Sequence, residues 1–353
     1  MGEGKLRTGL LGLDRRGQAA LDALCASDSF EVVAVADKDM AVAGRLAERI
    51  GAKAFDDYRQ FVLQNTLDCL IVCARLHSCL EHVRMALKKK THVLKWAPMA
   101  RTFSEASELA ALAAAEGVRF DVANPQYYCR DLGRLGGLIS EQTTDRPFLV
   151  QGRWEVGMAQ ESGGEIPSDK GGTWMTDKEL AGGGVLLYEG YGLIDRLVRG
   201  LGIPQQVYCL TRSHASSKAI PYLAEDVAVV SLRFGEGLIG DLVLIRHWDG
   251  RPGRRELRVL WKDRTVCTDG RDLMVLDAAG GEVERVDCRG DPSDQVGRLL
   301  EDYAASHSCP EDRPFASSAQ PNLQVMALME AAYLSAQTGS PESPARLLDR
   351  AGR

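Results

Sequence analysis

The 353-residue chain lacks several features that would point to particular classes of protein. No apolar run approaches the roughly 20 residues that cross a bilayer, so a membrane protein is not expected. A net charge of −6 without a basic patch argues against nucleic acid as a partner. Met1 to Arg7 lead straight into a strand-like run, so we expect no signal peptide.

The nine cysteines include no Cys-x-x-Cys pair. An odd number of thiols in a chain of this size predicts reduced cysteines in the cytoplasm and not a disulfide framework. His77, Cys79 and His82 fit no zinc spacing, so we expect no metal site.

The first third of the sequence alternates strand and helix patterns. Continuous apolar runs predict buried strands, and between them apolar residues recur at helical spacing. Ser78 with Glu81, and Thr102 with Glu105, have the spacing of capping boxes that open helices. Such alternation is typical of a parallel sheet covered on both faces. We therefore predict an α/β fold, with a doubly wound, Rossmann-type, dinucleotide-binding domain over residues 1–123.

The remainder, residues 124–353, has a different pattern. Strand-like runs follow one another closely, and Gly235-Glu236-Gly237 is typical of a hairpin turn. Short connections favour antiparallel pairing, because parallel strands need long crossovers. We expect an α+β domain with an open, mainly antiparallel sheet, and a late helix over 321–338. Predicted strands are 148–155, 206–212, 226–234, 238–247, 256–262 and 273–277.

The first strand is followed by Gly12-Leu13-Asp14-Arg15-Arg16-Gly17. A dinucleotide-binding turn has Gly-x-Gly-x-x-Gly here and an acid about 20 residues later. The first and third glycines are present, whereas the second is Asp14. Asp37 ends the second strand, where it would bind the ribose hydroxyls and favour NAD over NADP. Arg15 and Arg16 would offset the negative charge of Asp14. The alternative is that the loop turns the chain and binds nothing.

Two further segments resemble the Gfo/Idh/MocA oxidoreductases, and this resemblance covers nearly the whole chain. Residues 91–98 (THVLKWAP) match the family's strand ending in Glu-Lys-Pro. Residues 182–195 (GGGVLLYEGYGLID) match its Gly-Gly-Gly-x-Leu-x-Asp-x-Gly-x-His-x-x-Asp segment. The resemblance implies the fold given above, NAD(P)-dependent chemistry on sugars or cyclitols, and dimers or tetramers.

The chain departs from the family at the catalytic positions. The family's lysine is Ala97, its aspartate is Tyr188 and its histidine is Gly192. Oxidation of an alcohol needs a base for the hydroxyl proton, and neither alanine nor glycine supplies one. Lys95 lies two residues before Ala97 and would share its face in a strand. Tyr188 is a second candidate proton donor. The alternatives are a surface or interface lysine and a packing tyrosine.

Other candidate residues carry weaker signals. Family members use the loop that contains Ala74 and His77 near the nicotinamide, so the resemblance implies that these residues and Pro98 lie near the coenzyme. The alternative for His77 is a solvent-facing residue at the start of a helix. Trp174, Tyr128 and Tyr191 would line a cleft for a sugar ring, and Asp195 is retained from the family's polar set. Each of these aromatic residues is also compatible with a place in the core. Glu189 is a weaker replacement for the lost carboxylate.

Two functional hypotheses follow. The first is an NAD(P)-dependent oxidoreductase that acts on a sugar-like, polyol or carbonyl ligand with non-standard catalytic groups. The second is a redox-inactive relative that binds a ligand, a nucleotide or a protein partner, and a redox-neutral enzyme is a third, smaller one. A homodimer or homotetramer through the C-terminal sheet is expected, because an open sheet face exposes apolar surface.

Overall fold

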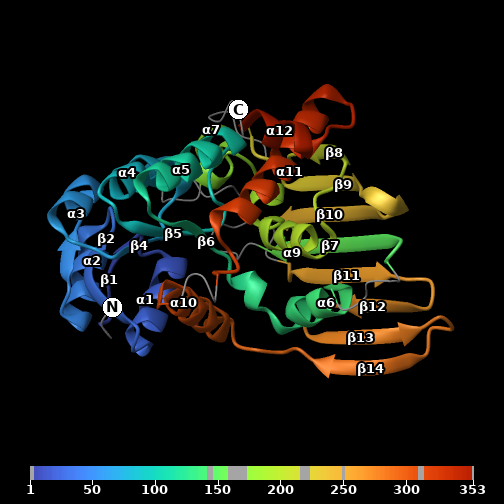
Figure 1. Ribbon diagram of the computed structural model, residues 1–353, viewed down its shortest axis with the longest axis horizontal. Coiled ribbons are helices and arrows are strands. Elements are labelled where there is room, and N and C mark those ends of the chain that lie inside the picture. Colours follow the sequence, from blue (N-terminus) through green and yellow to red (C-terminus); the bar gives the residue numbers. More distant parts are fainter. Residues whose placement is uncertain are drawn as a thin grey trace. The chain divides into compact units, whose positions relative to one another are not determined.

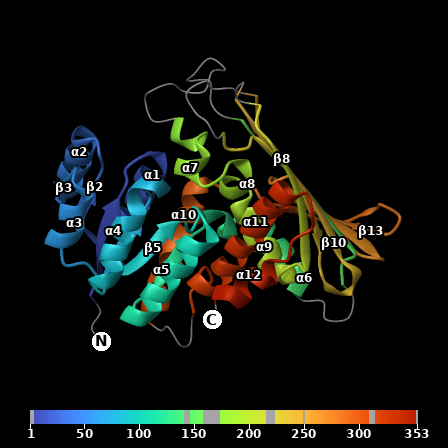
Figure 2. The same cartoon turned by 90° about the horizontal axis from the view of Figure 1, so that it is seen from above.

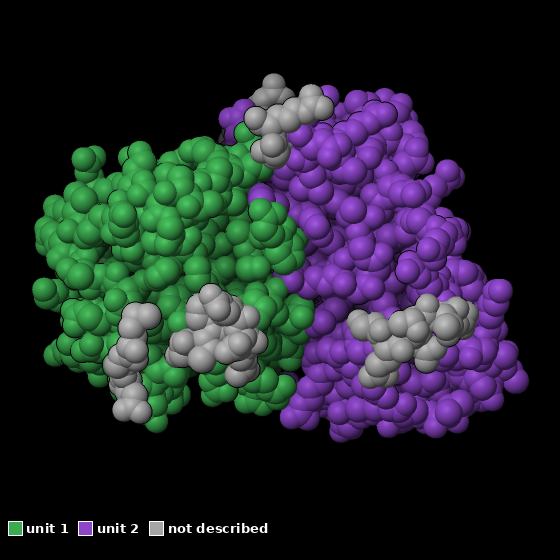
Figure 3. Space-filling model, viewed as in Figure 1, with its two compact units in different colours: residues 1–100, 104–128, 291–322 green, residues 101–103, 129–290, 323–353 purple. Residues whose placement is uncertain are grey.

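The computed structural model describes residues 4–140, 146–157, 173–214, 223–248, 251–308 and 314–351. The chain divides into two compact units (Figure 3). Unit 1 comprises residues 1–100, 104–128 and 291–322, and unit 2 comprises 101–103, 129–290 and 323–353. Residues 291–322, which the sequence analysis placed in the second domain, are thus part of unit 1.

Unit 1 contains a six-stranded parallel sheet with the order β3-β2-β1-β4-β5-β6. The order reverses between β1 and β4, which makes this the switch point where doubly wound sheets bind ligands. The predicted doubly wound fold is confirmed. The strands are β1 (Leu6–Leu11), β2 (Phe30–Ala36), β3 (Lys53–Phe55), β4 (Cys69–Val72), β5 (His92–Trp96) and β6 (Phe120–Ala123).

Helices connect these strands, and their apolar faces form the core with the sheet. Gly51, with φ of 70°, ends α2 in the left-handed conformation that glycine adopts most readily. The helices of unit 1 are α1 (Arg15–Ala26), α2 (Met40–Ile50), α3 (Tyr58–Gln64), α4 (Leu76–Lys88), α5 (Phe103–Glu116), the 3₁₀ turn η1 (Pro125–Tyr128) and α10 (Pro292–Ser308).

Helix α10 packs beside α1 (Figure 1). Its Leu299, Leu300 and Tyr303 enter the same buried cluster as Leu21 and Leu24 of α1. The apolar face of α10 therefore explains why a segment so late in the sequence returns to unit 1.

A polar cluster also holds the end of α10. The guanidinium of Arg119 contacts Asp121 Oδ2, His307 Nδ1 and Ser306 Oγ at 2.8, 3.0 and 3.1 Å. Burial is the main cause that lowers the pKa of His307 to about 4, so this imidazole is neutral at pH 7.

Unit 2 contains an eight-stranded sheet with the order β14-β13-β12-β11-β7-β10-β9-β8. β7 and β10 are parallel and the other neighbours are antiparallel, which confirms the mainly antiparallel prediction. Residues 235–237 join β9 to β10 as predicted. The strands are β7 (Leu149–Gly157), β8 (Gln206–Arg212), β9 (Val227–Arg233), β10 (Ile239–His247), β11 (Arg254–Leu260), β12 (Arg264–Thr268), β13 (Asp272–Asp277) and β14 (Glu282–Asp287).

The helices of unit 2 lie over one face of this sheet (Figure 2). They are α6 (Arg130–Ser140), the 3₁₀ turn η2 (Thr173–Met175), α7 (Lys178–Ala181), α8 (Val185–Tyr188), α9 (Tyr191–Leu201), α11 (Ala319–Thr338) and α12 (Pro344–Ala351). α11 corresponds to the helix predicted over 321–338, and its first residues fall in unit 1. None of the helices in the described residues is long and apolar enough to cross a membrane.

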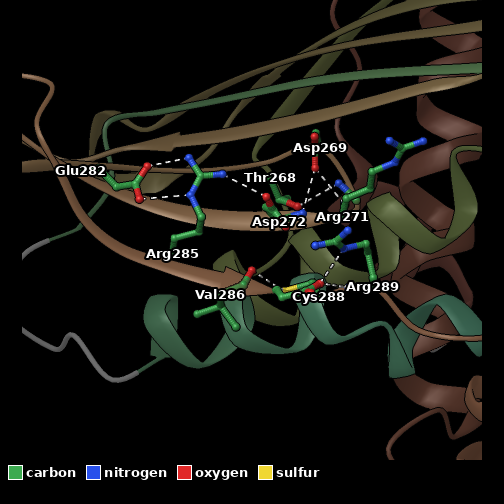
Figure 4. Close-up of polar contacts among 11 residues, drawn as sticks. Thr268, Asp269, Arg271, Asp272, Glu282, Arg285, Val286, Cys288 and Arg289 are labelled. Carbon is green, nitrogen blue, oxygen red and sulfur yellow. Dashed lines mark hydrogen bonds and ion pairs between the residues drawn. The ribbon is translucent and has the colours of Figure 1, made fainter.

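The edge strand β14 carries three acidic side chains and one arginine. Arg285 lies between Asp272 of β13 and Glu282, with nitrogen–oxygen distances of 2.9 and 2.6 Å (Figure 4). Charged side chains on an edge strand disfavour pairing with further strands. We infer that this edge of the sheet is protected from strand addition.

Candidate functional site

The loop after β1 is built around two close backbone approaches. Gly12 has φ of 91°, and a Cβ atom on it would lie 2.4 Å from the backbone nitrogen of Ala74. A Cβ atom on Gly17 would lie 1.9 Å from the carbonyl oxygen of Gly12. Both positions therefore need glycine, and this tight turn is the one that brings a coenzyme phosphate close to backbone amides.

Asp37, at the end of β2, is bonded to this loop. Its Oδ2 accepts from the backbone nitrogen of Leu13 at 2.7 Å, and its Oδ1 accepts from that of Asp39 at 3.0 Å. The half-buried carboxylate is thereby fixed against the loop that follows β1.

Asp14 replaces the second glycine and caps α1. Its Oδ1 accepts from the backbone nitrogens of Arg16 and Gly17 at 3.0 and 3.1 Å. Amides at a helix N-terminus are the groups that bind a phosphate in this fold. The carboxylate of Asp14 already bonds two of these amides, and the side chains of Asp14, Arg15 and Arg16 are exposed.

The other predicted coenzyme residues follow β4 and β5. Ala74 is buried against Gly12, and His77 is exposed in the first turn of α4. This helix begins at Leu76 and its N-cap is Arg75, so the predicted capping box at Ser78 is wrong. Pro98 is buried after a cis peptide bond with Ala97.

Lys95 is enclosed in unit 1, with 2% of its surface exposed. Its Nζ donates to the carbonyl oxygen of Trp96 at 2.7 Å. Burial lowers the pKa of this amine, and Cys79, Cys73 and Arg16 are the neighbours with the next largest effects. β5 ends at Trp96, so strand alternation does not extend to Ala97 as the sequence argument assumed.

Replacing Lys95 by Met is expected to stabilise the protein by about 1 kcal/mol and raise Tm by about 2–4 °C, because it removes an amine whose charged form is destabilised by burial. The folded pKa lies below the unfolded value of 10.5. Between these two pKa values the unfolded state binds more protons than the folded state. The destabilising effect of Lys95 therefore disappears as the pH rises towards 10.5. The gain in Tm, measured by calorimetry, should be larger at pH 7 than at pH 10.

Lys89→Met is the matched control. The Nζ of Lys89 donates to three carbonyl oxygens, those of Val62, Leu63 and Asn65, at 2.9, 3.1 and 2.8 Å. Its replacement should lower Tm. A fall in Tm for Lys95→Met as well would contradict the expected desolvation penalty.

In unit 2, each glycine of the Gly182–Gly184 segment has a separate steric reason. Gly182 ends α7 with φ of 83°. A Cβ atom on Gly183 would lie 2.1 Å from Tyr333 Oη, and one on Gly184 would lie 2.0 Å from the carbonyl oxygen of Glu225. The three glycines thus let α8 start against Glu225 and Tyr333.

Glu225 is the buried acceptor beneath this segment. Its Oε2 accepts from Gly184 N at 2.9 Å, and its Oε1 accepts from Leu186 N at 3.0 Å and from Tyr333 Oη at 2.9 Å. Burial raises the pKa of Glu225. This carboxyl group thereby fixes the start of α8, which carries Tyr188.

Tyr188 is 7% exposed, and its hydroxyl donates to the carbonyl oxygen of Ala181 at 2.8 Å. The half-buried ring of Trp174 meets it edge-on at 5.8 Å. Gly192, which the sequence analysis aligned with the family's histidine, is buried in α9. The structure therefore brings Tyr188 and Trp174 together in unit 2, whereas Lys95 belongs to unit 1.

The remaining predicted substrate residues make contacts inside their own units. Asp195 is fully buried and contacts Arg199 Nε at 2.6 Å, and Tyr191 is 1% exposed. Tyr128 belongs to unit 1, where its hydroxyl donates to Asp302 Oδ2 at 2.7 Å. Burial favours the core alternative for Tyr191.

The sequence analysis missed Glu225, Tyr333 and Arg246. Strand alternation would have identified Arg246, because it shares a face of β10 with the buried Leu242 and Leu244. Nothing in the sequence pattern around Glu225 or Tyr333 indicates that they meet, since 108 residues separate them.

The strand order and the glycine turn define a doubly wound unit in a chain with a second, α+β unit. Residues 6–124 match the family model GFO_IDH_MocA, described as an oxidoreductase family with an NAD-binding Rossmann fold. This match confirms the resemblance to the Gfo/Idh/MocA oxidoreductases over residues 6–124.

Individual relatives extend the comparison. D-glucoside 3-dehydrogenase of Escherichia coli (strain K12) is 28% identical over 181 residues, which are 51% of this chain and 49% of that protein. The chain thus matches about half the length of this relative.

Solved structures cover nearly the whole chain at low identity. An oxidoreductase from Agrobacterium radiobacter, in complex with NAD+, L-tartaric acid and magnesium, has a TM-score of 0.82 at 16% identity and covers 98% of this chain and 100% of its own. Levoglucosan dehydrogenase, in complex with NADH and levoglucosan, has a TM-score of 0.83 at 17% identity and covers 96% of this chain and 99% of its own. At such identities the likeness concerns the fold.

Proposed function

We propose that this protein is an NAD-dependent oxidoreductase that acts on a sugar-like, polyol or carbonyl substrate with non-standard catalytic groups. The observation that carries the proposal is the turn between Gly12 and Gly17, closed against Ala74 and bonded to Asp37. These residues would hold NAD, which takes up or releases a hydride when bound. The relatives whose names specify sugars or polyols agree with this substrate class.

Lys95 is our candidate for the proton transfer. A general base works best when its pKa lies near the working pH, and burial moves this amine in that direction. Its hydrogen bond to the Trp96 carbonyl holds the nitrogen at the end of β5. Tyr188 is the candidate donor from unit 2.

Turnover measurements test both assignments. NAD reduction would be followed by absorbance with a panel of sugars and polyols, for the wild type, Lys95→Met and Tyr188→Phe. The assignments require loss of turnover with NAD affinity kept. Unchanged turnover in both variants would exclude the two residues and leave the fold intact.

NAD is expected to be preferred over NADP, because the Asp37 carboxylate repels a 2′-phosphate. Replacing Asp37 by Ser is expected to reduce the ratio of NAD to NADP affinity roughly tenfold or more. Calorimetric titration of both coenzymes measures this ratio. An unchanged ratio would mean that Asp37 acts on the loop alone, through Leu13 N.

The second candidate function is a redox-inactive protein that binds a ligand, a nucleotide or a partner. The position of Asp14 favours it, because this carboxylate takes amides that would otherwise face the pyrophosphate. Titration with NAD and NADP separates the two functions. Failure to bind either coenzyme at millimolar concentration would remove the oxidoreductase proposal.

A homodimer or homotetramer through the C-terminal sheet is part of the proposal. In the described chain, no helix covers the second face of this sheet (Figure 2). Ile239 and Leu210 of this sheet are 53% and 55% exposed, and exposed apolar surface favours an interface. Light scattering should therefore give a dimer or tetramer, and a monomer at micromolar concentration would contradict it. A cytoplasmic location is also proposed, since none of the eight described cysteines is in a disulfide.

A further inference from the structure

Arg246, near the end of β10, is a buried guanidinium with an unused hydrogen-bonding edge. Its side chain is 1% exposed, and in the described structure neither Nε nor Nη2 has a hydrogen-bond partner. Glu189 Oε1 lies 3.8 Å from Nη2, too far for a hydrogen bond. The charge is therefore partly balanced, while the donors are not satisfied.

Such an arrangement is costly without an acceptor, because a buried charged donor loses its bonds to water. Nε and Nη2 form one planar edge of the guanidinium, with two parallel N–H bonds. That edge matches the two oxygens of a carboxylate, which it binds in bidentate fashion. A single hydroxyl would satisfy one of the two nitrogens.

The surroundings of Arg246 are fixed by other contacts. The Trp248 ring lies 5.7 Å from the guanidinium carbon. Its Nε1 donates to Asp226 Oδ1 at 2.7 Å, and Asp226 Oδ2 accepts from His214 N at 2.9 Å. The carbonyl oxygen of Asp226 accepts from Arg246 N at 2.7 Å. The carboxylate of Asp226 is thus engaged by Trp248 and His214, and it holds the indole of Trp248 beside Arg246.

The position of Arg246 connects it with the motif of unit 2. Glu189 directly follows Tyr188, the residue at the family's catalytic aspartate position. Arg246 lies on the face of β10 that packs against α8. A group bound to its free edge would therefore lie next to the segment that carries Tyr188.

We propose that the Nε–Nη2 edge of Arg246 is a subsite for the carboxylate of an acidic sugar, with Glu189 moving aside when the ligand binds. The inference rests on the proposed function, which it narrows from sugar-like ligands to sugar acids. Trp248 supplies an apolar flank for the bound ring.

Matched ligand pairs test the subsite. D-glucuronate and D-glucose share a ring and differ in the carboxylate, as do D-galacturonate and D-galactose. Calorimetry with the NAD-saturated protein and with the protein alone should give roughly 10- to 100-fold tighter binding of the acid in at least one pair. Equal affinities for acid and neutral sugar in both pairs would overturn the proposal.

Variants assign the preference to the residue. Arg246→Lys keeps the charge but loses the planar fork, and it should remove most of the acid preference without changing affinity for the neutral sugar. Arg246→Met should remove it fully, and Arg233→Met, at an exposed arginine of β9, should leave it unchanged. Retention of the preference in Arg246→Lys, or its loss in Arg233→Met, would refute the assignment.

The same measurements separate this inference from the proposed function. NAD-dependent turnover of neutral sugars without preference for acids would sustain the oxidoreductase and exclude the subsite. Acid binding that depends on Arg246 but is accompanied by no NAD-dependent turnover would sustain the subsite and favour the redox-inactive function.

Discussion

Asp14→Gly is expected to tighten NAD binding about 10- to 100-fold, because a carboxylate beside a pyrophosphate costs on the order of 1–3 kcal/mol at this exposure. The substitution restores the glycine pattern and frees the amides of Arg16 and Gly17. It costs the helix about a few tenths of a kcal/mol, since glycine is a tolerable N-cap. Calorimetric titration measures the affinity.

Asp14→Asn separates charge from shape. Asparagine caps a helix about as well as aspartate, so α1 should be unchanged while the negative charge is removed. If repulsion dominates, this variant should bind NAD nearly as well as Asp14→Gly. If the side chain blocks the phosphates by its bulk, Asp14→Gly alone should gain affinity.

The matched control is Asp57→Asn on α3. Asp57 caps its helix in the same way, with Oδ1 accepting from Arg59 N at 2.8 Å and from Gln60 N at 3.1 Å. It lies outside the glycine loop, so NAD affinity should not change. If both Asp14 variants bind NAD no better than the wild type, Asp14 does not oppose the coenzyme.

The sequence was most informative where local patterns determine structure. Runs of apolar residues located the parallel strands of unit 1, and the glycines at 12 and 17 identified the turn, because each has a single steric reason. Short strands with many polar residues were missed: β3, β12 and β14 contain three to six residues. Their pairing depends on neighbouring strands and not on their own pattern.

The helix cap at Asp14 could have been predicted from the sequence but was not. An aspartate directly before a helix is a typical N-cap, so its bonds to the second and third helical amides were predictable. Interpreting Asp14 as a defect in a phosphate motif hid this role. The opposite error occurred at Ser78, where the correct spacing of a capping box lies inside a helix that begins at Leu76.

Long-range contacts were beyond local patterns. The return of α10 to unit 1 depends on Leu299 and Tyr303 meeting α1, more than 270 residues earlier in the sequence. Glu225 and Tyr333 likewise come together through the packing of unit 2. Amphipathic spacing predicts that such a helix is buried on one face but does not specify its partner.

Glu225→Ala should have the largest effect on stability, a loss of about 3–5 kcal/mol, because three buried donors lose their acceptor. Two of them, Gly184 N and Leu186 N, start α8. At about 2–4 °C per kcal/mol, the Tm of unit 2 should fall by roughly 10 °C. Thermal unfolding followed by calorimetry measures this shift.

Tyr333→Phe is the graded control, because it removes one of the three donors and leaves the carboxylate with both amides. It should cost about 1 kcal/mol, which is typical of a single hydrogen bond. Since Tyr188 is the last residue of α8, both variants should reduce any turnover in the same order as they reduce Tm. If Glu225→Ala lowers stability no more than Tyr333→Phe, the Glu225 carboxylate does not hold the start of α8. The need for glycine at positions 182–184 would then have to be explained by close packing against the Glu225 backbone alone.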